Sequence, residues 1–477
     1  MVFSSLFFVF FFFVLCMGLL IAVRTTKRQN IVLLLFSLVF YAWGGPALLL
    51  LLCGMTLICY LGARLIEALE QRFHRSMVLL VTVGTCLILL GFFKYSNFIA
   101  NGVSVLIGYD GALPNIVLPI GISFYTFQLL SYVADVWRGE VEAQKKYWML
   151  LLYASLFHQC VAGPIVRYRD VCAELEKRSL TIPDMAGGIT RFCAGLAKKA
   201  VLANTCGALA TALLEPAALP TASSGTVFLG GLFYMLQIYL DFSAYSDMAI
   251  GMGRMAGIHY VENFNYPYTA TSVTDFWRRW HISLSSFFRD YVYIPLGGNR
   301  CRIPRQIFNL FAVWALTGLW HGASWNYVLW GLYYFVFLVL EKFIFRPKKD
   351  APLPIMVLRR IGVLAVVYFG WLLFYFEDLS ALGTALSSLF CLGGNAFWDL
   401  YARTKLLNNL FFLAVAVLAC TPIVPFLHKK LSDRAAHSAK WQTAEGVISV
   451  AAPVLLLLLS LIFLVGNTYN PFLYYQF

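Results

Sequence analysis

The chain has 477 residues, of which 60% are hydrophobic and 12% are charged. Soluble globular chains have about 45–50% apolar and about 25% charged residues. Disordered chains are poor in aromatic residues, whereas 17% of this chain is aromatic. The composition therefore excludes both classes and predicts an all-α polytopic integral membrane protein.

The 36 Lys and Arg against 23 Asp and Glu give a net charge of +13. In a membrane protein this excess indicates cytoplasmic loops, because basic residues gather on the cytoplasmic side. We therefore expect membrane lipids, and no nucleic acid, among its partners. The eleven cysteines include no CxxC pair, so we interpret them as small core residues rather than as disulfides or metal ligands.

The first apolar runs predict successive crossings. Residues 1–23 are nearly all apolar and are followed directly by Arg24, the reverse of a signal peptide, so we expect an uncleaved first helix with its N-terminus outside. Residues 31–63 predict two passes with a break at Gly44, Gly45 and Pro46. An outward pass near 77–97 and an inward pass near 115–137 are expected next.

The segment 147–164 is apolar but has basic residues on both sides, which favours a short or re-entrant helix pair over a simple crossing. The topology of 147–225 stays open. Later apolar runs lie near 226–256, 306–345, 361–376, 406–427 and 446–466. In total we expect about nine to eleven crossings plus re-entrant or interfacial helices, in one membrane domain over 1–477 with both termini outside.

Ionisable residues inside apolar runs are site candidates, because an unpaired charge there costs several kcal/mol. They are Lys94, Asp135, Asp241, Asp247, Arg254 and His321. We expect Lys94 to extend to the interface and Asp135 to pair with a basic residue. Asp241 and Asp247 lie roughly 120° apart on a helix, so they cannot form a close acid/base pair; structural pairing and the orienting of a histidine or an arginine both stay open.

Residues 275–291 sort into two stripes at helical spacing. Phe276, Trp280, Leu284, Phe287 and Tyr291 form an apolar stripe, and Arg278, His281, Ser285 and Arg289 form a polar one. The pattern predicts an interfacial amphipathic helix or a re-entrant wall. Its arginines either lie on the anionic inner leaflet or face a polyanionic donor such as coenzyme A, because guanidinium groups suit phosphates.

His321 lies between basic clusters that end at Arg305 and resume at Lys342. As one helix, residues 306–341 would span about 54 Å, against a hydrocarbon core of about 30 Å. The segment must therefore rise and return, with His321 near the turn. Imidazole titrates near neutrality, so His321 is suited to acid/base catalysis. The alternative is a structural role, in which His321 is hydrogen-bonded within the core.

Several strings together resemble a known family: PIGISFYTFQ (119–128), AGPIVRYRD (162–170), YLDFSAYSDMAIG (239–251), FWRRWHISLSSFFRDYVYIPLGGNR (276–300) and GLWHGASWNYVLWG (318–331). The sequence resembles the membrane-bound O-acyltransferase (MBOAT) family, in its bacterial alginate O-acetyltransferase branch. The motifs fill a core at 115–345, and the helices of 346–477 diverge. The resemblance implies helices around a central tunnel, with no resident cofactor.

The resemblance also implies which residues act. His321 is the expected base, and His281 matches a second histidine of the family. We further predict that donor or substrate binding involves Arg278, Arg279, Trp280, Asp247, Ser243, Arg289, Trp320 and Asn326, and we expect no metal. The implied reaction passes an acetyl group from a cytoplasmic thioester, acetyl-CoA or an acyl carrier, outward through the bacterial inner membrane to a polysaccharide or to a periplasmic acetyltransferase partner.

Alternatives remain at this stage. Within the acyltransferases, O-acetylation of peptidoglycan and D-alanyl transfer to teichoic acid compete with acetylation of an alginate-like glycan. From another class, a proton-coupled transporter or flippase could use Asp241, Asp247 and His321 as a relay.

Overall fold

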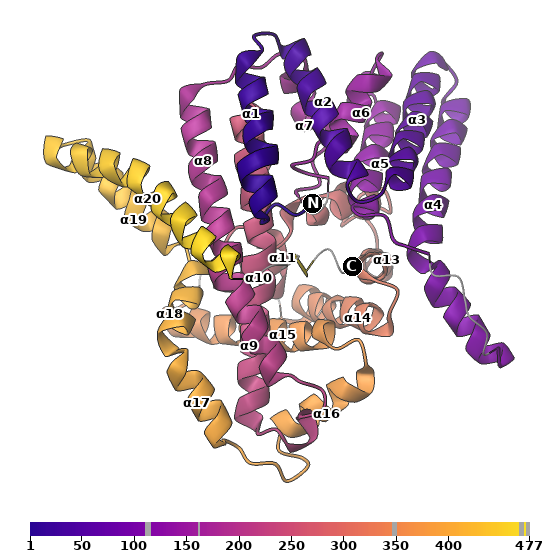
Figure 1. Cartoon of the computed structure of the whole chain (residues 1–477). Helices are drawn as coiled ribbons and strands as arrows, with labels where there is room; N and C mark the ends of the chain where they lie inside the picture. Colours follow the sequence, from indigo (N-terminus) through magenta and orange to yellow (C-terminus); the bar gives the residue numbers. More distant parts are fainter. Residues whose placement is uncertain (110–115, 161–162, 346–350, 467–471, 474–477) are drawn as a thin grey trace.

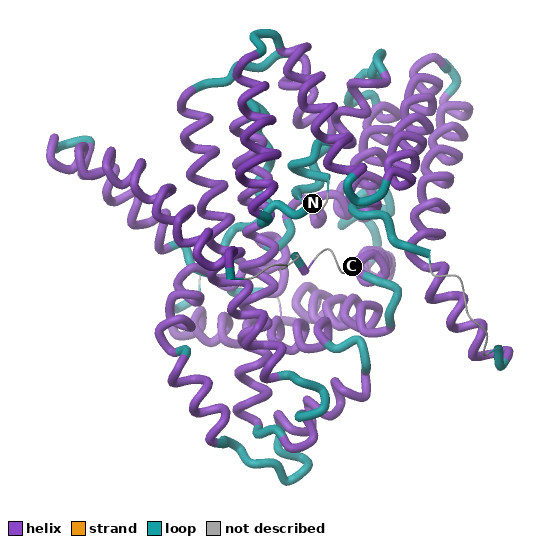
Figure 2. The backbone as a smooth tube through the Cα atoms, in the orientation of Figure 1, coloured by secondary structure: helices purple, strands orange, loops and turns teal. Residues whose placement is uncertain are grey.

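A computed structural model describes residues 1–109, 116–160, 163–345, 351–466 and 472–473. All regular elements in these residues are helices or helical turns (Figure 2). The chain therefore has the all-helical architecture that the composition predicts, and Figure 1 shows how the helices are arranged.

The N-terminal helices follow the apolar runs. They are the π-helical turn η1 (Phe8–Phe12), α1 (Phe13–Ala22), α2 (Thr26–Ala42), α3 (Pro46–Ala68), α4 (Arg72–Ile107) and α5 (Ile122–Arg138). The expected break between α2 and α3 is confirmed. Gly45 has φ 140°, a conformation that glycine adopts readily, and Pro46 occupies the first helical position of α3, where it needs no N–H partner.

In the described part of 147–164 the chain forms one short helix, α6 (Tyr147–Ser155), which agrees with the expectation that this segment is no simple crossing, and α7 (Tyr168–Glu176) follows it. After them come α8 (Ile182–Ala197), η2 (Lys198–Ala203), α9 (Asn204–Leu213), η3 (Leu219–Thr221) and the long α10 (Ser224–Met255).

The second half contains η4 (Pro267–Thr269), α11 (Val273–Arg279), α12 (Ile282–Phe288), η5 (Arg289–Tyr293), α13 (Ile303–His321), α14 (Trp325–Leu340), η6 (Glu341–Phe345) and α15 (Leu353–Tyr375). The last helices are α16 (Leu379–Leu389), α17 (Leu400–Asn408), α18 (Leu410–Ala419), α19 (Ile423–Ala435) and α20 (Ala439–Val465). In Figure 1, α19 and α20 extend away from the other helices at one side.

Among the described residues, six helices are long and apolar enough to cross a membrane, or seven if the bent pair α17 and α18 is one crossing. The protein is thus a multi-pass membrane protein, but this number is below the expected nine to eleven. The expectation treated each apolar run as a crossing. Helices α2 and α5, with 17 residues each, are not among these six and lie at the lower end of the roughly 17–25 residues of a crossing.

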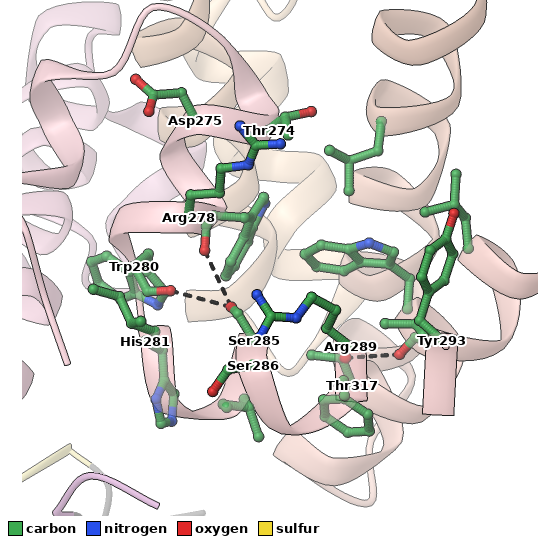
Figure 3. A pocket seen from close by; sticks show the side chains of 18 of the residues that line it. Thr274, Asp275, Arg278, Trp280, His281, Ser285, Ser286, Arg289, Tyr293 and Thr317 are labelled. Atoms are coloured by element: carbon green, nitrogen blue, oxygen red, sulfur yellow. Dashed lines mark hydrogen bonds between the residues drawn. The ribbon is translucent and has the colours of Figure 1, made fainter. Parts of the chain in front are cut away.

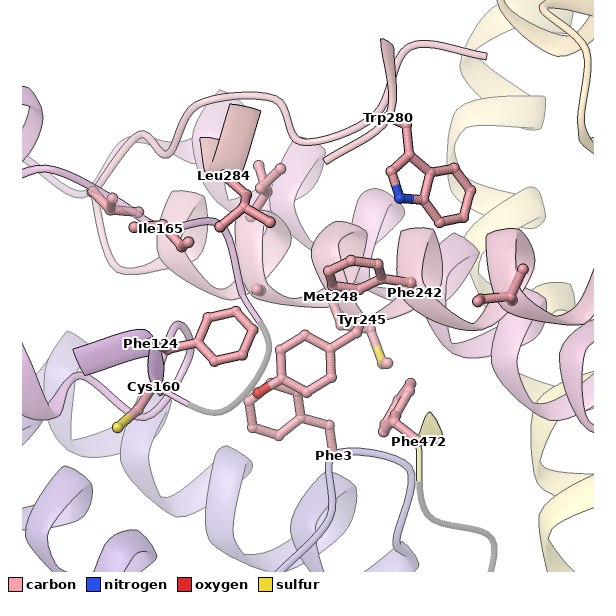
Figure 4. Packing of buried hydrophobic residues seen from close by; sticks show 14 of the residues in the cluster. Phe3, Phe124, Cys160, Ile165, Phe242, Tyr245, Met248, Trp280, Leu284 and Phe472 are labelled. Carbon is pink, nitrogen blue, oxygen red and sulfur yellow. The ribbon is translucent and has the colours of Figure 1, made fainter. Parts of the chain in front are cut away.

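Helix α10 lies in the middle of the protein. It packs closely on α8 through small residues, because a Cβ at Gly188 would lie 2.7 Å from the Gly251 carbonyl oxygen. The two ends of the chain also meet on α10: the rings of Phe3 and Phe472 lie 4.7 and 5.0 Å from that of Tyr245 (Figure 4). Residues near both ends of the described chain therefore pack against the same ring of α10.

The carboxylates of α10 have separate partners. Asp241 accepts a hydrogen bond from Lys199 Nζ at 2.6 Å, and both side chains are buried. Asp247 pairs with Lys198 and with Arg191. Each carboxylate thus has its own cation, in agreement with the expectation that they do not form a close acid/base pair.

Candidate active site

The polar stripe around His281 lies on two short helices rather than on one. We expected an amphipathic helix or a re-entrant wall here; for the first of these, α11 ends at Arg279 and α12 begins at Ile282. His281 has φ 45°, a left-handed conformation that cannot continue a right-handed helix. The expectation of a single helix was wrong because the N–H of Ile282 donates to the carbonyl of Asn263, at 2.9 Å, instead of to a residue one turn earlier.

His281 is held within a buried polar group. Its Nδ1 lies 3.1 Å from Asn263 Oδ1 and 3.4 Å from Ser283 Oγ. The side chain is 1% exposed, and its ring lies edge-on to that of Phe242 at 4.7 Å. The ring is therefore fixed by hydrogen bonds on one side and by aromatic packing on another.

His321 is the last residue of α13, and α14 begins at Trp325. The expected rise and return of the chain is confirmed. The two helices approach closely at two glycines, since a Cβ at Gly318 would lie 2.5 Å from the Tyr327 carbonyl oxygen, and one at Gly331 would lie 2.4 Å from that of Trp314. This hairpin fixes the position of His321.

Two side chains of α4 bind the end of α13. Lys94 Nζ donates to the carbonyl of Trp320, and the Tyr95 hydroxyl donates to that of Leu319. The last carbonyls of a helix have no partner within the helix. Lys94 therefore binds the end of a neighbouring helix, and its extension to the interface stays a prediction.

Aromatic rings surround the His321 imidazole. The rings of Trp320 and Trp330 each lie 4.8 Å away, and that of Phe374 lies at 5.2 Å. The His281 ring in turn lies 5.9 Å from the Trp320 ring. The same indole therefore contacts both histidines.

One cavity of about 1050 Å³ is lined by both histidines. They are buried, whereas Arg278 and Arg289, which also line it, are exposed. Figure 3 shows Arg278, Ser285 and Arg289 around this cavity, with His281 at its lower left. The cavity thus joins a basic surface to two imidazoles in the interior.

The remaining charges of the lining add to this basic surface. Lys342 and Arg359 line the cavity, together with Asp275 and Glu341. Both carboxylates already have partners: Asp275 binds Arg279 at 2.9 Å, and Glu341 accepts the Val273 and Thr274 N–H groups at the start of α11. The lining is therefore suited to an anionic ligand.

Not every predicted site residue lines this cavity. Trp280 does. Trp320 lines a second, largely apolar cavity whose walls include α4, α5 and α13, and Asn326 donates to the Phe374 carbonyl at 3.1 Å. Ser243 accepts from Lys198 at 3.1 Å, beside the ion pair of Asp247. Roles for these residues and for Arg279 stay predictions.

The sequence reasoning missed Asn263, Lys342 and Arg359. Lys342 and Arg359 belong to basic clusters that were interpreted only as topology signals. No spacing pattern connects Asn263 with His281, because the two meet through folding. In the described part of the chain, no group of three or more His, Cys, Asp or Glu side chains is placed to hold a metal ion.

The structure thus combines an all-helical membrane fold with two buried histidines on a basic cavity. The model of the membrane-bound O-acyltransferase family matches residues 71–383. The chain is 38% identical over 412 residues to a probable alginate O-acetylase of Pseudomonas aeruginosa, covering 84% of this chain and 78% of that protein.

Two further relatives match nearly the whole chain. A probable alginate O-acetylase of Azotobacter vinelandii is 36% identical, over 92% of this chain and 93% of that protein. A peptidoglycan O-acetyltransferase of Helicobacter pylori is 28% identical, over 92% and 90%. The chain belongs to the membrane-bound O-acyltransferase family and is an O-acyltransferase.

Proposed function

We propose that this enzyme moves an acetyl group from a cytoplasmic thioester to the outside of the bacterial inner membrane, for O-acetylation of an alginate-like or other surface polysaccharide. The observation that carries the proposal is the single cavity that joins the basic surface to His281 and His321. The names of the similar proteins support the acetyl group and the polysaccharide acceptor.

The basic surface supports a phosphate-bearing donor. Arg278 and Arg289 are exposed and line the cavity together with Lys342, and Arg289 is also paired with Asp290. Guanidinium groups bind phosphate through two parallel hydrogen bonds. Basic loops favour the cytoplasmic side, so the donor enters from the cytoplasm, either as acetyl-CoA or as the thioester of an acyl carrier.

His321 acts as the general base. It accepts the proton of the acceptor hydroxyl while that oxygen attacks the thioester carbonyl, an ester C–O bond forms, and the C–S bond breaks. The proton then passes from the imidazole to the leaving thiolate, so the ring returns to its starting state. The surrounding Trp320, Trp330 and Phe374 rings exclude water, which would otherwise hydrolyse the thioester.

His281 contributes from the same cavity, by binding the reacting groups or by proton transfer.

The two termini lie outside the cytoplasm in this proposal, and a periplasmic acetyltransferase partner completes the transfer to the polymer. Peptidoglycan stays the second candidate acceptor, because the peptidoglycan O-acetyltransferase also matches nearly the full chain.

The test is the base-labile acetate content of exported polysaccharide and of cell wall in cells that carry the wild type or His321→Ala. We expect at least about a 10²-fold loss of transfer, the lower end of what general-base catalysis contributes. His428→Ala is the matched control, because His428 is exposed on α19. The polymer that loses acetate identifies the acceptor. Unchanged acetate in every fraction, at equal membrane levels, would overturn the proposal and favour the transporter alternative.

A further inference from the structure

We propose that Asn263 is a positioning residue that keeps the proton of the His281 imidazole on Nδ1, so that Nε2 is the basic nitrogen. The inference rests on the proposed function, in which His281 acts from the cavity. Asn263 lies in the loop between α10 and α11 and is completely buried.

The hydrogen bonds fix which way the Asn263 amide points. Its Oδ1 lies 3.3 Å from the backbone N of Ser283 and 2.8 Å from Ser283 Oγ. A backbone N–H can only donate, so the atom facing it must be the amide oxygen. The Nδ2 group on the other side donates to Ser246 Oγ of α10 at 3.0 Å. Both ends of the amide are thus assigned by their partners.

The same oxygen fixes the tautomer of His281. Asn263 Oδ1 accepts, so His281 Nδ1, at 3.1 Å, must carry the proton. A neutral imidazole has one N–H and one lone pair, and the lone pair is therefore on Nε2. Ser283 Oγ lies close to the same nitrogen but is already assigned: it accepts from the Ile165 N–H at 3.0 Å and donates to Asn263.

Asn263 also holds the backbone around the histidine. Its carbonyl accepts the Ile282 N–H at 2.9 Å, and the neighbouring Asn265 N–H donates to the Arg279 carbonyl at 2.9 Å. The left-handed backbone of His281 is sparsely populated and persists only where its surroundings enforce it. One loop therefore determines both the backbone conformation and the protonated nitrogen of His281.

The choice of an amide has a chemical consequence. A carboxylate in this place would stabilise the charged imidazolium, whereas an amide oxygen orients the ring without adding charge. The neutral ring then keeps Nε2 as its basic nitrogen, on a side chain that lines the cavity. A group that orients a catalytic histidine through Nδ1 is a recurrent feature of acyl-transfer sites.

The test compares Asn263→Leu with Asn263→Asp in full-length protein labelled with ¹⁵N at histidine, using His281→Ala to assign the His281 signals by solid-state NMR. Wild type should show the Nδ1–H form. Asn263→Leu should lose it, with kcat lowered by about 10²-fold and the KM for acetyl-CoA little changed. Asn263→Asp keeps the acceptor oxygen, so it should retain the Nδ1–H signal.

Ser246→Ala is the matched control, because it removes only the partner of Nδ2; it should leave the tautomer in place. An Nε2–H signal in wild type, or an unchanged Nδ1–H signal in Asn263→Leu, would overturn the inference. The NMR result does not depend on turnover. An Asn263-dependent tautomer together with acetate transfer that does not need His321 would therefore contradict the proposed function and not the hydrogen-bond assignment.

Discussion

Helices α10 and α20 are both long and apolar, yet they occupy opposite environments. Of the most apolar stretch of each, 83% is buried inside the protein in α10 and 17% in α20. Helix α20 is the more apolar of the two, while α10 carries Asp241, Asp247 and several serines. In lipid, apolar side chains gain little by moving into protein, whereas polar groups must find partners there. Polarity within an apolar run, rather than hydrophobicity, thus marks the helix at the centre.

The glycines of α10 and α20 differ in the same way as the two helices do. In α10 a Cβ at Gly251 would lie 2.7 Å from the Gly188 carbonyl oxygen and 2.8 Å from the Phe192 amide nitrogen. In α20 a Cβ at Gly446 would have no atom within 4 Å. Small residues let central helices approach closely, whereas the outer helix places no such demand on its sequence.

The largest expected effect comes from breaking the buried ion pair of α10. Lys199→Met leaves Asp241 as an uncompensated buried charge, which should cost about 3–5 kcal/mol. The apparent melting temperature in detergent measures the loss. The double variant Lys199→Met with Asp241→Leu should recover most of it, because the charge is removed with its partner. Equal melting temperatures for wild type and Lys199→Met would contradict the assignment of α10 to the core.

A smaller effect is expected from adding one methyl group. Gly251→Ala should destabilise by about 1–3 kcal/mol, because the new Cβ meets backbone atoms that cannot move aside cheaply. Gly446→Ala is the matched change on α20 and should be neutral or stabilising by about 0.5–1 kcal/mol, since alanine suits a helix better than glycine. The melting temperatures of the two variants, measured side by side, test this difference. An equal drop in melting temperature for both would contradict the contrast between α10 and α20.

The smallest effect concerns pH at the loop that follows α10. The hydrogen bond to Glu174, and then the one to Asp184, raise the pKa of His259 above its ordinary value. The folded pKa thus exceeds the unfolded one, so this stabilisation is complete below about pH 6.5 and is lost as pH rises through the folded pKa. The melting temperature of wild type minus that of His259→Gln should therefore shrink with rising pH. A difference that stays constant or grows would contradict the pairing.

The sequence predicted most helices because their signals are local. The apolar runs, the break at Gly44, Gly45 and Pro46, and the return of the chain after His321 all follow from hydrophobicity and length over neighbouring residues. The motifs likewise indicated the family. Among the described residues, fewer helices than expected are long and apolar enough to cross a membrane, since apolar runs such as those of α2 and α5 form helices of only 17 residues.

Part of the site was also predicted, because some of its residues lie in motifs along the chain. His281, Arg278, Arg289 and His321 stand in motifs, and they do line one cavity. The interruption at His281 was not predictable, because helical spacing continues through it and the hydrogen bonds that break the helix come from Asn263. Lys342 and Arg359 reach the cavity from other helices.

By itself, then, the sequence determined the membrane class, the helix positions and the family, since these depend on composition and on motifs along the chain. Only the tertiary structure decided which helix is central, which cations share a cavity with the histidines, and which nitrogen of His281 carries the proton. These depend on hydrogen bonds and packing between residues distant in sequence, which no local pattern encodes.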